Sequence, residues 1–384
     1  MLRHALVTLY PWDVLDGHIG ELLDRLHGEI GVTGVSLWTG CPPTVHLRSR
    51  DMQPRLIRSA GGLFFRPTPR FYDDASCFQA VAATDATRER DPLRILSEAC
   101  AVRRMELRAK VSCSLSGGIT ARHPMAATVN AFDDASSGSV CLANPEIQRF
   151  LCALATDLSS AAGLSALELI DSVIAWHEAA AGVRAAVPLG EAERILLGTC
   201  FCEACRVKTT AAGVDFAAAK RACRTLLNTA LEDPLAKGPR IAGLLAESVA
   251  LRSLFEWRSS ELASFLRHLA AASHCEVILD RSFDPIELRQ HNAAVLATPA
   301  AVLSRLDRVA QLDSIVSPGV RRYELRVPAA LAIGANGAEL VSALSQAAVR
   351  GVSGVQFDTY GLLPESALTV VRQAIRYARR ANQA

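Results

Sequence analysis

Residues 5–38 read ALVTLYPWDVLDGHIGELLDRLHGEIGVTGVSLW, and this stretch contains one complete strand–helix–strand unit. Ala5–Tyr10 is an apolar run typical of a buried strand, Ile19–Ile30 has leucines at helical spacing, and Gly34–Trp38 is a second apolar run. The first run is followed by the sequence PWD, and not by the glycine-rich loop of a dinucleotide-binding fold. The stretch therefore predicts parallel strands joined by a crossover helix.

The same alternation of strands and helices continues along the chain. Further strands are predicted at Glu106–Ser112, Ser165–Ile170, Glu276–Asp280, Ser314–Ser317, Tyr323–Val327 and Gly354–Tyr360. Helices are predicted at Leu93–Arg104, Pro145–Leu158 and Ala367–Arg379. Eight such units close a barrel, so the sequence predicts an α/β protein with a (β/α)8 TIM-barrel fold. A doubly wound open sheet is the alternative.

Two segments interrupt this alternation within what we interpret as a single barrel domain, residues 1–384. Residues 39–90 form a long loop between the second strand and the second helix, and residues 173–272 form a mostly helical insertion after strand 4. Long loops inside a compact domain are usually functional. We find neither an internal repeat nor a low-complexity linker.

The composition excludes several classes of protein. Half of the 384 residues are hydrophobic and 21% are charged, which permits a large core and excludes wholesale disorder. A net charge of +2 is too small to indicate the basic surface that binding to nucleic acid or to an acidic membrane requires. No apolar window reaches about 18 residues, so no transmembrane helix is predicted. We expect a cytoplasmic protein with a small-molecule substrate, without nucleic-acid or membrane partners, and able to form a homo-oligomer.

The most specific motif is a cluster of cysteines. Cys200, Cys202 and Cys205 follow a C-x-C-x2-C pattern, which lets three thiols face one point in a tight turn. Zinc in structural sites takes four ligands in a tetrahedron, so a fourth must come from elsewhere in the chain. The simpler interpretation is three unrelated core cysteines.

This motif resembles the zinc-binding motif of the glycoside hydrolase family 42 β-galactosidases. Those enzymes carry a further cysteine upstream, just before a helix start that contains Asn and Pro, and this chain has Cys141 before Asn144 and Pro145. The resemblance implies a closed, structural zinc site made of Cys141, Cys200, Cys202 and Cys205. Cys152 is the alternative fourth ligand, although its helical phase beside Leu151 favours core packing.

The wider chain resembles bacterial barrel proteins described as glycoside-hydrolase-like, through four short motifs that span most of its length. They are Tyr10–Asp13, Cys141–Pro145, Cys200–Cys205 and Tyr360–Leu362. The segment after the fourth strand is usually rich in histidine in such proteins, whereas this chain has only His177 there. The third strand also runs into SCSLS, where a histidine and an amide are expected. These departures favour a non-hydrolytic chemistry as an alternative.

In a barrel, the active site lies at the carboxyl ends of the strands. Glycoside hydrolysis needs two carboxyl groups, one acting as acid and the other as nucleophile or base. We predict Glu168 or Asp171, on the fourth strand and its exit, as proton donor, and Asp280 or Asp358 as its partner. The predicted substrate-binding residues are Tyr10, Trp12, Asp13, Trp38, His46, Trp176, His177, Arg281, Arg326 and Tyr360.

Each of these residues also has a purely structural interpretation. Glu168 is predicted to face the barrel interior, where a carboxylate needs a cation such as Arg281 or Arg326 as its partner. Asp13 could cap the following helix, and Asp358 could anchor a loop. We therefore predict a glycosidase-like hydrolase acting on a small sugar-containing substrate. The alternatives are a lyase, isomerase or cyclase of a specialised pathway, and a non-catalytic binding protein on the same scaffold. Carboxylates tied up in salt bridges with Arg281 or Arg326, or pointing to different places, would count against the hydrolase and favour the alternatives. A zinc-catalysed hydrolase is a weaker hypothesis, because four thiolates leave no open metal position.

Overall fold

The computed structural model describes residues 3–16, 18–50, 53–72, 78–114, 118–172, 174, 189–232, 241–280, 301–305, 322–334 and 337–380, and it gives residues 301–305 by their backbone alone. Among the described residues, no helix is both long enough and apolar enough to cross a membrane.

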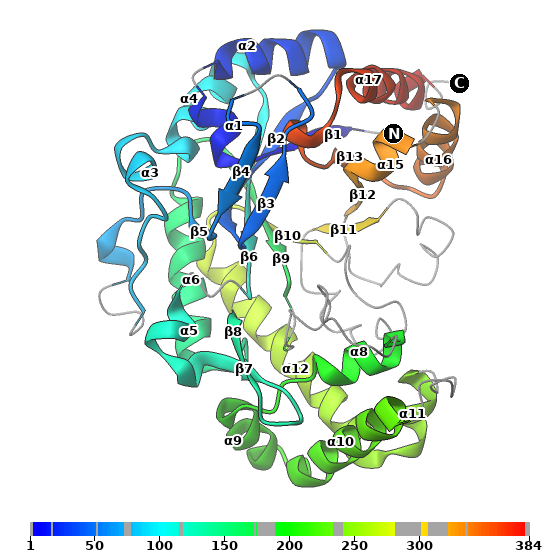
Figure 1. The fold of residues 1–384 in the computed structure, drawn as a ribbon. Helices are drawn as coiled ribbons and strands as arrows, with labels where there is room; N and C mark the ends of the chain where they lie inside the picture. The colour runs from blue at the N-terminus through cyan, green and yellow to red at the C-terminus, as the bar shows by residue number, and fades with distance from the viewer. Residues whose placement is uncertain are drawn as a thin grey trace.

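The centre of the molecule is a curled sheet of parallel strands (Figure 1). Its parallel strands within the described ranges are β1 His4–Leu9, β2 Gly34–Cys41, β6 Glu106–Ser112, β9 Leu164–Ile170, β10 Glu276–Asp280, β11 Ala301–Arg305, β12 Arg322–Val327 and β13 Gly354–Phe357. The hydrogen-bonded order is β1-β13-β12-β11-β10-β9-β6-β2, and β2 pairs with β1 again, so the ring of pairings returns to its start. This arrangement is that of a TIM-like α/β barrel.

Most of the predicted strands are confirmed, and the differences lie near the end of the chain. The strand β11, between β10 and β12, was not predicted, and the predicted strand Ser314–Ser317 lies outside the described residues. The last strand is shorter than predicted: β13 ends at Phe357, and Tyr360–Leu362 form the 3-10 helix η7.

Helices cover the outside of the sheet, and two of them show why they start where they do. Helix α4 (Pro92–Arg103) begins after Asp91, whose carboxylate accepts hydrogen bonds from the backbone of Leu93 and Arg94. Helix α6 (Pro145–Ser159) begins after Asn144, whose side chain accepts from Glu146 N. A capping side chain followed by proline at the first helical position is a strong start signal. The other helices around the sheet are α1 Pro11–Leu15, α2 Ile19–Asp24, α15 Ala329–Gly334, α16 Gly337–Val349 and α17 Glu365–Arg380. The helix predicted at Ile19–Ile30 is an α-helix only as far as Asp24 and continues as the π-helix η1 (Arg25–Ile30).

The long segment 39–90 is not a bare loop in its described parts. It contains an antiparallel hairpin, β3 (Thr44–Leu47) with β4 (Leu56–Ser59), then the short strand β5 (Gly62–Leu63), the 3-10 helix η2 (Pro69–Phe71) and helix α3 (Asp85–Glu89). Half-buried and exposed residues alternate along both strands of the hairpin, so one face turns inward and the other outward. A second hairpin, β7 (Ala127–Val129) with β8 (Ala135–Val140), follows the short helix α5 (Ile119–Arg122) and the 3-10 helix η3 (Pro124–Ala126).

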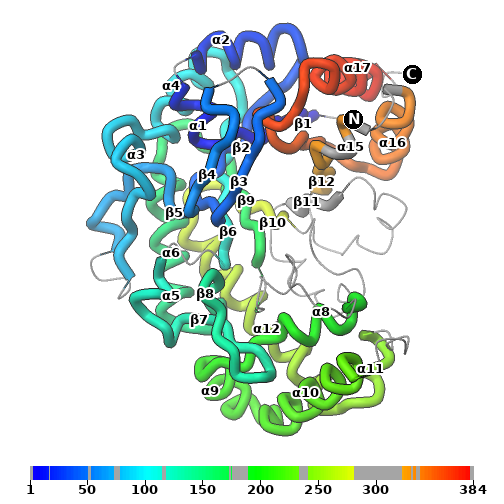
Figure 2. Tube along the Cα trace, in the orientation of Figure 1, coloured from blue at the N-terminus to red at the C-terminus, as the bar shows by residue number. Residues whose placement is uncertain are grey.

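The described part of the segment between β9 and β10 is helical. It contains α8 Glu191–Leu197, α9 Glu203–Ala211, α10 Phe216–Glu232, α11 Ile241–Glu247 and α12 Val249–Ala272. These helices have an apolar core of their own, in which Leu196, Leu227, Leu245 and Leu254 are buried. Figure 2 shows α9, α10 and α11 gathered at the lower end of the molecule, while the long α12 leads back toward the sheet.

Candidate functional site

The interior of the parallel sheet is lined by charged side chains, where barrels of this kind usually hold branched aliphatic ones. Arg108 and Lys110 alternate with the apolar residues of β6 and are fully buried. Arg108 donates to both carboxylate oxygens of Glu324, at 2.6 and 3.0 Å. Because a buried charge without a partner is costly, these residues are held in the interior by pairing with one another.

Glu168, one of the predicted proton donors, lies inside this network. Its Oε2 accepts hydrogen bonds from Ser36 Oγ at 2.7 Å and from Gln356 Nε2 at 3.0 Å. Arg108 donates to Oε1 at 3.4 Å, and the ammonium of Lys110 is 3.6 Å from Oε2. The cationic partners of Glu168 are therefore both on β6, and its side chain is fully buried.

Asp280 and Asp358 lie at the carboxyl ends of their strands and share one cation. Arg326 NH1 donates to Asp280 Oδ2 at 2.9 Å, and Arg326 Nε donates to Asp358 Oδ2. Lys110 Nζ donates to the same oxygen of Asp280 at 2.8 Å, and Thr8 Oγ1 donates to Asp358 Oδ1 at 3.3 Å. Two predicted catalytic carboxylates and the predicted binding residue Arg326 are thus brought together, and they are tied in ion pairs.

An aromatic wall, made of Tyr10, Trp12, Trp38 and His46, stands at the same end of the barrel. Tyr10 stacks on Trp12 and on Trp38 with centroid distances of 4.6 and 5.8 Å. His46, carried by strand β3, meets Tyr10 edge-on at 4.4 Å. Burial lowers the pKa of His46. Burial raises the pKa of Tyr10 well above its usual range, and the charges of Cys41 and Asp358 raise it further. The aromatic wall therefore lies within electrostatic range of the carboxylates.

Two residues that follow strands of the barrel have strained backbones. Asp171, directly after β9, has φ of 57°, and Thr359, two residues after β13, has φ of 32°. Positive φ is rare outside glycine, and for a β-branched residue such as threonine it is a true outlier that tends to occur at functional sites. The carboxylate of Asp171 accepts a hydrogen bond from Ser112 Oγ at 2.8 Å.

Two other predicted binding residues lie beneath the β3–β4 hairpin. Asp13 Oδ2 accepts a hydrogen bond from the backbone N of Tyr10 at 2.9 Å, as a helix cap does. Burial raises the pKa of Asp13 to about 6, although Tyr10 N–H and Arg48 lower it. The guanidinium of Arg50 lies over the ring of Tyr360 at 3.6 Å, and Arg50 NH2 donates to the backbone carbonyl of Tyr360 at 2.8 Å. These contacts connect the hairpin to α1 and η7.

Three predicted binding residues, Trp176, His177 and Arg281, lie outside the described residues. Conversely, the sequence analysis missed Lys110, Ser36 and Gln356, which contact the predicted carboxylates. A signal for Lys110 was present, because charged residues that alternate with apolar ones in a buried strand must face the barrel interior.

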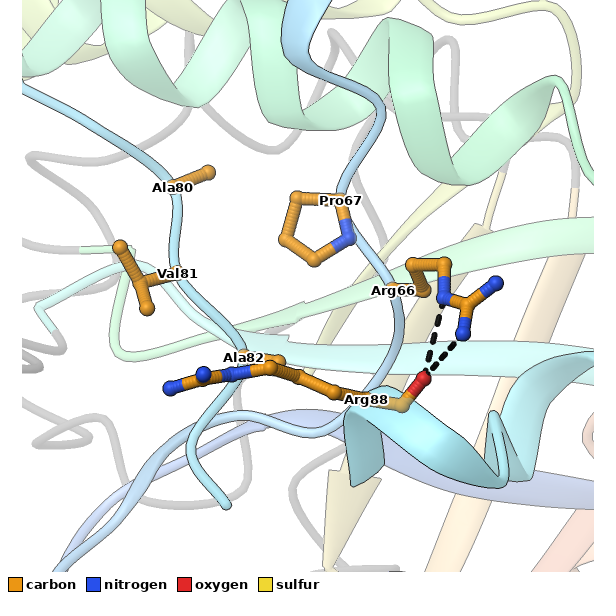
Figure 3. A pocket seen from close by; sticks show the side chains of 6 residues that line it. All are labelled: Arg66, Pro67, Ala80, Val81, Ala82 and Arg88. Carbon is orange, nitrogen blue, oxygen red and sulfur yellow. Dashed lines mark hydrogen bonds between the residues drawn. The ribbon is translucent and has the colours of Figure 1, made fainter. Parts of the chain in front are cut away.

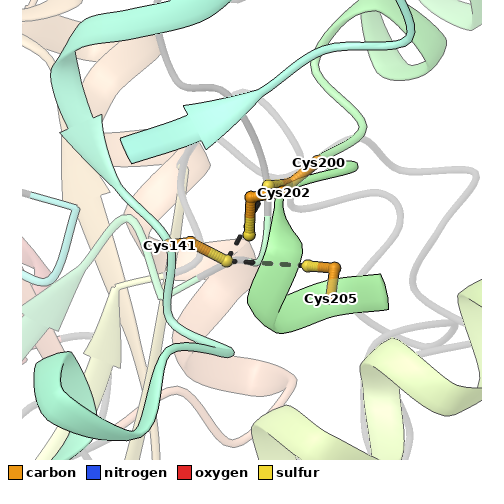
Figure 4. Close-up of side chains that lie close together, drawn as sticks. All are labelled: Cys141, Cys200, Cys202 and Cys205. Atoms are coloured by element: carbon orange, nitrogen blue, oxygen red, sulfur yellow. Dashed lines mark hydrogen bonds between the residues drawn. The ribbon is translucent and has the colours of Figure 1, made fainter. Parts of the chain in front are cut away.

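The four predicted zinc ligands form a second, separate cluster. Sγ of Cys141, which follows β8, is 3.6 Å from Sγ of Cys205 and 3.7 Å from that of Cys200. The sulfur atoms of Cys141, Cys200, Cys202 and Cys205 lie within 4.8 Å of one another and are buried (Figure 4). Four thiolates at the usual zinc–sulfur distance of about 2.3 Å would have sulfurs roughly 3.8 Å apart, which fits this cluster. Cys152, the alternative fourth ligand, is not part of it.

The thiols of this cluster also perturb one another. Hydrogen bonds from Cys141, Cys200 and Cys205 hold the pKa of Cys202 far below its usual range, while the pKa of Cys141 is raised, first by its hydrogen bond with Cys200. The cluster could hold a metal ion, since a cation stabilises thiolates that otherwise repel one another.

A cavity of about 520 Å³ lies elsewhere, in the segment that follows the first hairpin (Figure 3). It is lined by Arg66, Pro67, Ala80, Val81, Ala82 and Arg88. Arg66 donates from Nε to the backbone carbonyl of Arg88 at 3.1 Å. Its guanidinium is therefore used within the chain, and the cavity brings no predicted catalytic residue together.

Comparisons with other proteins bear on the fold. No protein-family model matches the chain, and no curated protein matches it. The chain is similar in structure to α-L-fucosidase isoenzyme 2 from Paenibacillus thiaminolyticus, with a TM-score of 0.50 and 11% identity over 99% of this chain and 49% of that one. A family 36 α-galactosidase, AgaA from Geobacillus stearothermophilus, has a TM-score of 0.49 and 11% identity over 99% and 42%. The α-L-fucosidase AlfC from Lactobacillus casei has a TM-score of 0.43 and 10% identity over 99% and 96%.

The chain therefore has an α/β barrel fold similar to that of the fucosidase from Paenibacillus thiaminolyticus. The chain spans less than half the length of the first two of these structures. At such low identity the likeness concerns the fold alone, and function must be argued from the site.

Proposed function

We propose that this chain is a glycoside-hydrolase-like (β/α)8 barrel enzyme that acts on a small sugar-containing substrate at the carboxyl ends of its strands. The observation that carries the proposal is the meeting of an aromatic wall with three carboxylates at one end of the barrel. Sugar rings stack on aromatic faces, and glycoside hydrolysis needs two carboxyl groups.

The carboxylates differ in how well their surroundings suit each role. Glu168 is fully buried, accepts hydrogen bonds from three side chains and lies 3.6 Å from the ammonium of Lys110, so in this proposal it serves as a fixed counter-charge beneath the substrate. Asp171, beside a serine hydroxyl and on a strained backbone, is then the proton donor. Asp280 or Asp358 acts as the partner carboxylate, after Arg326 has moved from at least one of them.

A second candidate function is a non-hydrolytic barrel enzyme, a lyase or an isomerase, that uses the same mouth. The bridging of Asp280 and Asp358 by Arg326 favours it, because a carboxylate already held by a cation is less free to attack or to transfer a proton. In both proposals, residues 1–384 form a single barrel domain, and the helical segment 173–272 is an insertion.

We propose that the four-cysteine cluster holds a structural zinc ion. Four thiolate ligands suit Zn²⁺ and leave it no open position for catalysis. Cys141 follows the β7–β8 hairpin, whereas Cys200, Cys202 and Cys205 lie at the start of α9, so the ion would bind the helical insertion to the barrel.

Sugar binding and hydrolysis test the proposed function separately. Tryptophan fluorescence of the purified protein is followed while monosaccharides are added, in the wild type, in Trp12→Ala and in the control Trp257→Phe on α12. We expect a saturable change that persists in the control and is lost in Trp12→Ala, because Trp12 belongs to the aromatic wall. No saturable change with any sugar in the wild type would contradict the proposal.

Hydrolysis is measured as release of nitrophenol from a panel of nitrophenyl glycosides. We expect Asp171→Asn to lower kcat by about 10²-fold or more, as loss of a general acid does, and we expect a loss of the same size from at least one of Asp280→Asn and Asp358→Asn, as loss of the partner carboxylate does. Asp85→Asn, on the exposed helix α3, is the control that should keep full activity. Sugar binding without hydrolysis by the wild type would reject the hydrolase and support the second candidate.

A further inference from the structure

Lys110 is a primary amine at the centre of the barrel, and neither proposed mechanism uses it. Its side chain is fully buried, and Nζ donates to Asp280 Oδ2 at 2.8 Å and lies 3.6 Å from Glu168 Oε2. The same nitrogen lies 5.4 Å from the centroid of the Trp38 ring. The amine therefore lies beside the aromatic wall on one side and beside a carboxylate on the other.

The amino-acid usage of the chain makes a lysine at this position informative. The sequence contains 37 arginines and only four lysines. Arginine is also the residue best suited to a buried ion pair, and the neighbouring interior positions use it, as Arg108 and Arg326. Lysine differs from arginine in one chemical respect that matters here, since its amine becomes a nucleophile when it loses a proton.

We propose that Lys110 forms a Schiff base with a small hydroxyaldehyde or hydroxyketone, such as the open-chain form of a sugar. The proposal rests on the sugar-binding mouth of the proposed function. It supplies the second candidate function, a lyase or an isomerase, with a covalent intermediate. Among the described residues, Asp280 is the ion-pair partner that lies within 3 Å of the Lys110 amine, and it is the group placed to exchange protons with this amine.

The step balances without any further reactant. Asp280 takes one proton from the ammonium of Lys110, and the free amine adds to the carbonyl carbon to give a carbinolamine. As the adduct forms, its oxygen takes a second proton from the nitrogen and becomes a hydroxyl, and Asp280 then returns the first proton to this hydroxyl, which leaves as water while the nitrogen keeps its third proton. A protonated imine, one water molecule and the Asp280 carboxylate remain. Such an imine withdraws electrons from the adjacent carbon, as aldol-type cleavage and carbonyl isomerisation require.

Borohydride trapping on the wild-type protein tests this inference directly. The folded protein is incubated with glycolaldehyde or dihydroxyacetone, reduced with sodium borohydride, digested and examined by mass spectrometry. Lys208 and Lys220 serve as internal controls, because both are half-buried and form ion pairs, with Glu261 and Asp133. We expect Lys110 to be labelled about tenfold faster than either control in the folded protein, and all three at similar rates after denaturation in urea.

Circular dichroism first confirms that the protein used is folded. The inference is overturned if Lys110 in this folded protein stays unlabelled, or is labelled no faster than Lys208 and Lys220. Asp280→Asn should slow the labelling of Lys110 and leave that of the two control lysines unchanged. If this variant does not fold, the wild-type comparison still decides the matter. Saturable sugar binding without trapping would refute the Schiff base alone, and trapping without sugar binding would refute the proposed glycosidase function alone.

Discussion

Replacement of Cys141 by serine tests the metal centre most sharply, because this residue joins the centre to the barrel side of the molecule. A metal held by Cys141 and Cys205 closes a loop of 64 residues. A cross-link over a loop of that length lowers the chain entropy of the unfolded state enough to stabilise the fold by about 4 kcal/mol at 25 °C. Structural zinc ions bind with more free energy than this, about 10–16 kcal/mol, and part of it is used to order the site.

We expect Cys141→Ser to lose the metal and to destabilise the protein by about 4 kcal/mol, which lowers Tm by roughly 5 °C in a chain of 384 residues. Metal content is measured by plasma mass spectrometry and unfolding by circular dichroism. Limited proteolysis should first cut the described helices between β9 and β10, in residues 189–232 and 241–272. Cys152→Ser is the matched control, since Cys152 is a half-buried cysteine on α6 outside the cluster. A Cys141→Ser protein that still holds one metal ion per chain and melts like the wild type would refute this reasoning, as would loss of the metal from Cys152→Ser.

Three further predictions concern the barrel itself. Arg326→Met should lower the free energy of unfolding in urea by about 3–5 kcal/mol, because Asp280 and Asp358 would lose the cation that bridges them. An unchanged urea midpoint would disprove this pairing. Burial raises the pKa of Asp13 from its usual value to about 6, so the folded state binds a proton on this carboxyl group more tightly than the unfolded state does. The protonated Asp13 therefore contributes its full share to the free energy of unfolding below about pH 4, and this contribution is lost as the pH rises through 6. Asp13→Asn should flatten this part of the pH dependence of the urea midpoint, and an unaltered profile would contradict it. Gly34→Ala should lower the free energy of unfolding by about 1–3 kcal/mol, because the new Cβ would lie 2.6 Å from Glu106 Cβ. Gly28→Ala is the control: its new Cβ meets nothing within 4 Å, so thermal unfolding should show no measurable change.

Much of the barrel could be predicted from local sequence. Strands such as Glu276–Asp280 were predicted with the bounds that the structure gives, because a buried parallel strand must be a short apolar run. Helix α6 was predicted because Asn144 and Pro145 start it and leucines follow at helical spacing. The sequence analysis missed β11, whose short run AVLSR ends in polar residues and resembles the end of a longer apolar stretch.

The candidate site was predicted in part. The strand-end rule identified Asp280, Asp358, Tyr10 and Trp38, and the structure brings these residues to one end of the barrel. The rule cannot say which cation each carboxylate meets. Lys110 was overlooked because the rule considers only strand ends. Its alternation with the apolar residues of β6 places it in the barrel interior, but only the tertiary structure shows that it meets Asp280.

The sequence by itself determined the order of most barrel strands and helices and the spacing of Cys200, Cys202 and Cys205, because both depend on residues close together in the chain. Only the tertiary structure decided the pairing of Arg108 with Glu324, 216 residues apart, and the approach of Cys141 to the other three cysteines. The ring closes where His4 pairs with Gly354, at opposite ends of the chain. Partners separated so far along the chain are selected by the geometry of the closed sheet, which sets the strand order and register, and no local pattern of residues encodes that choice.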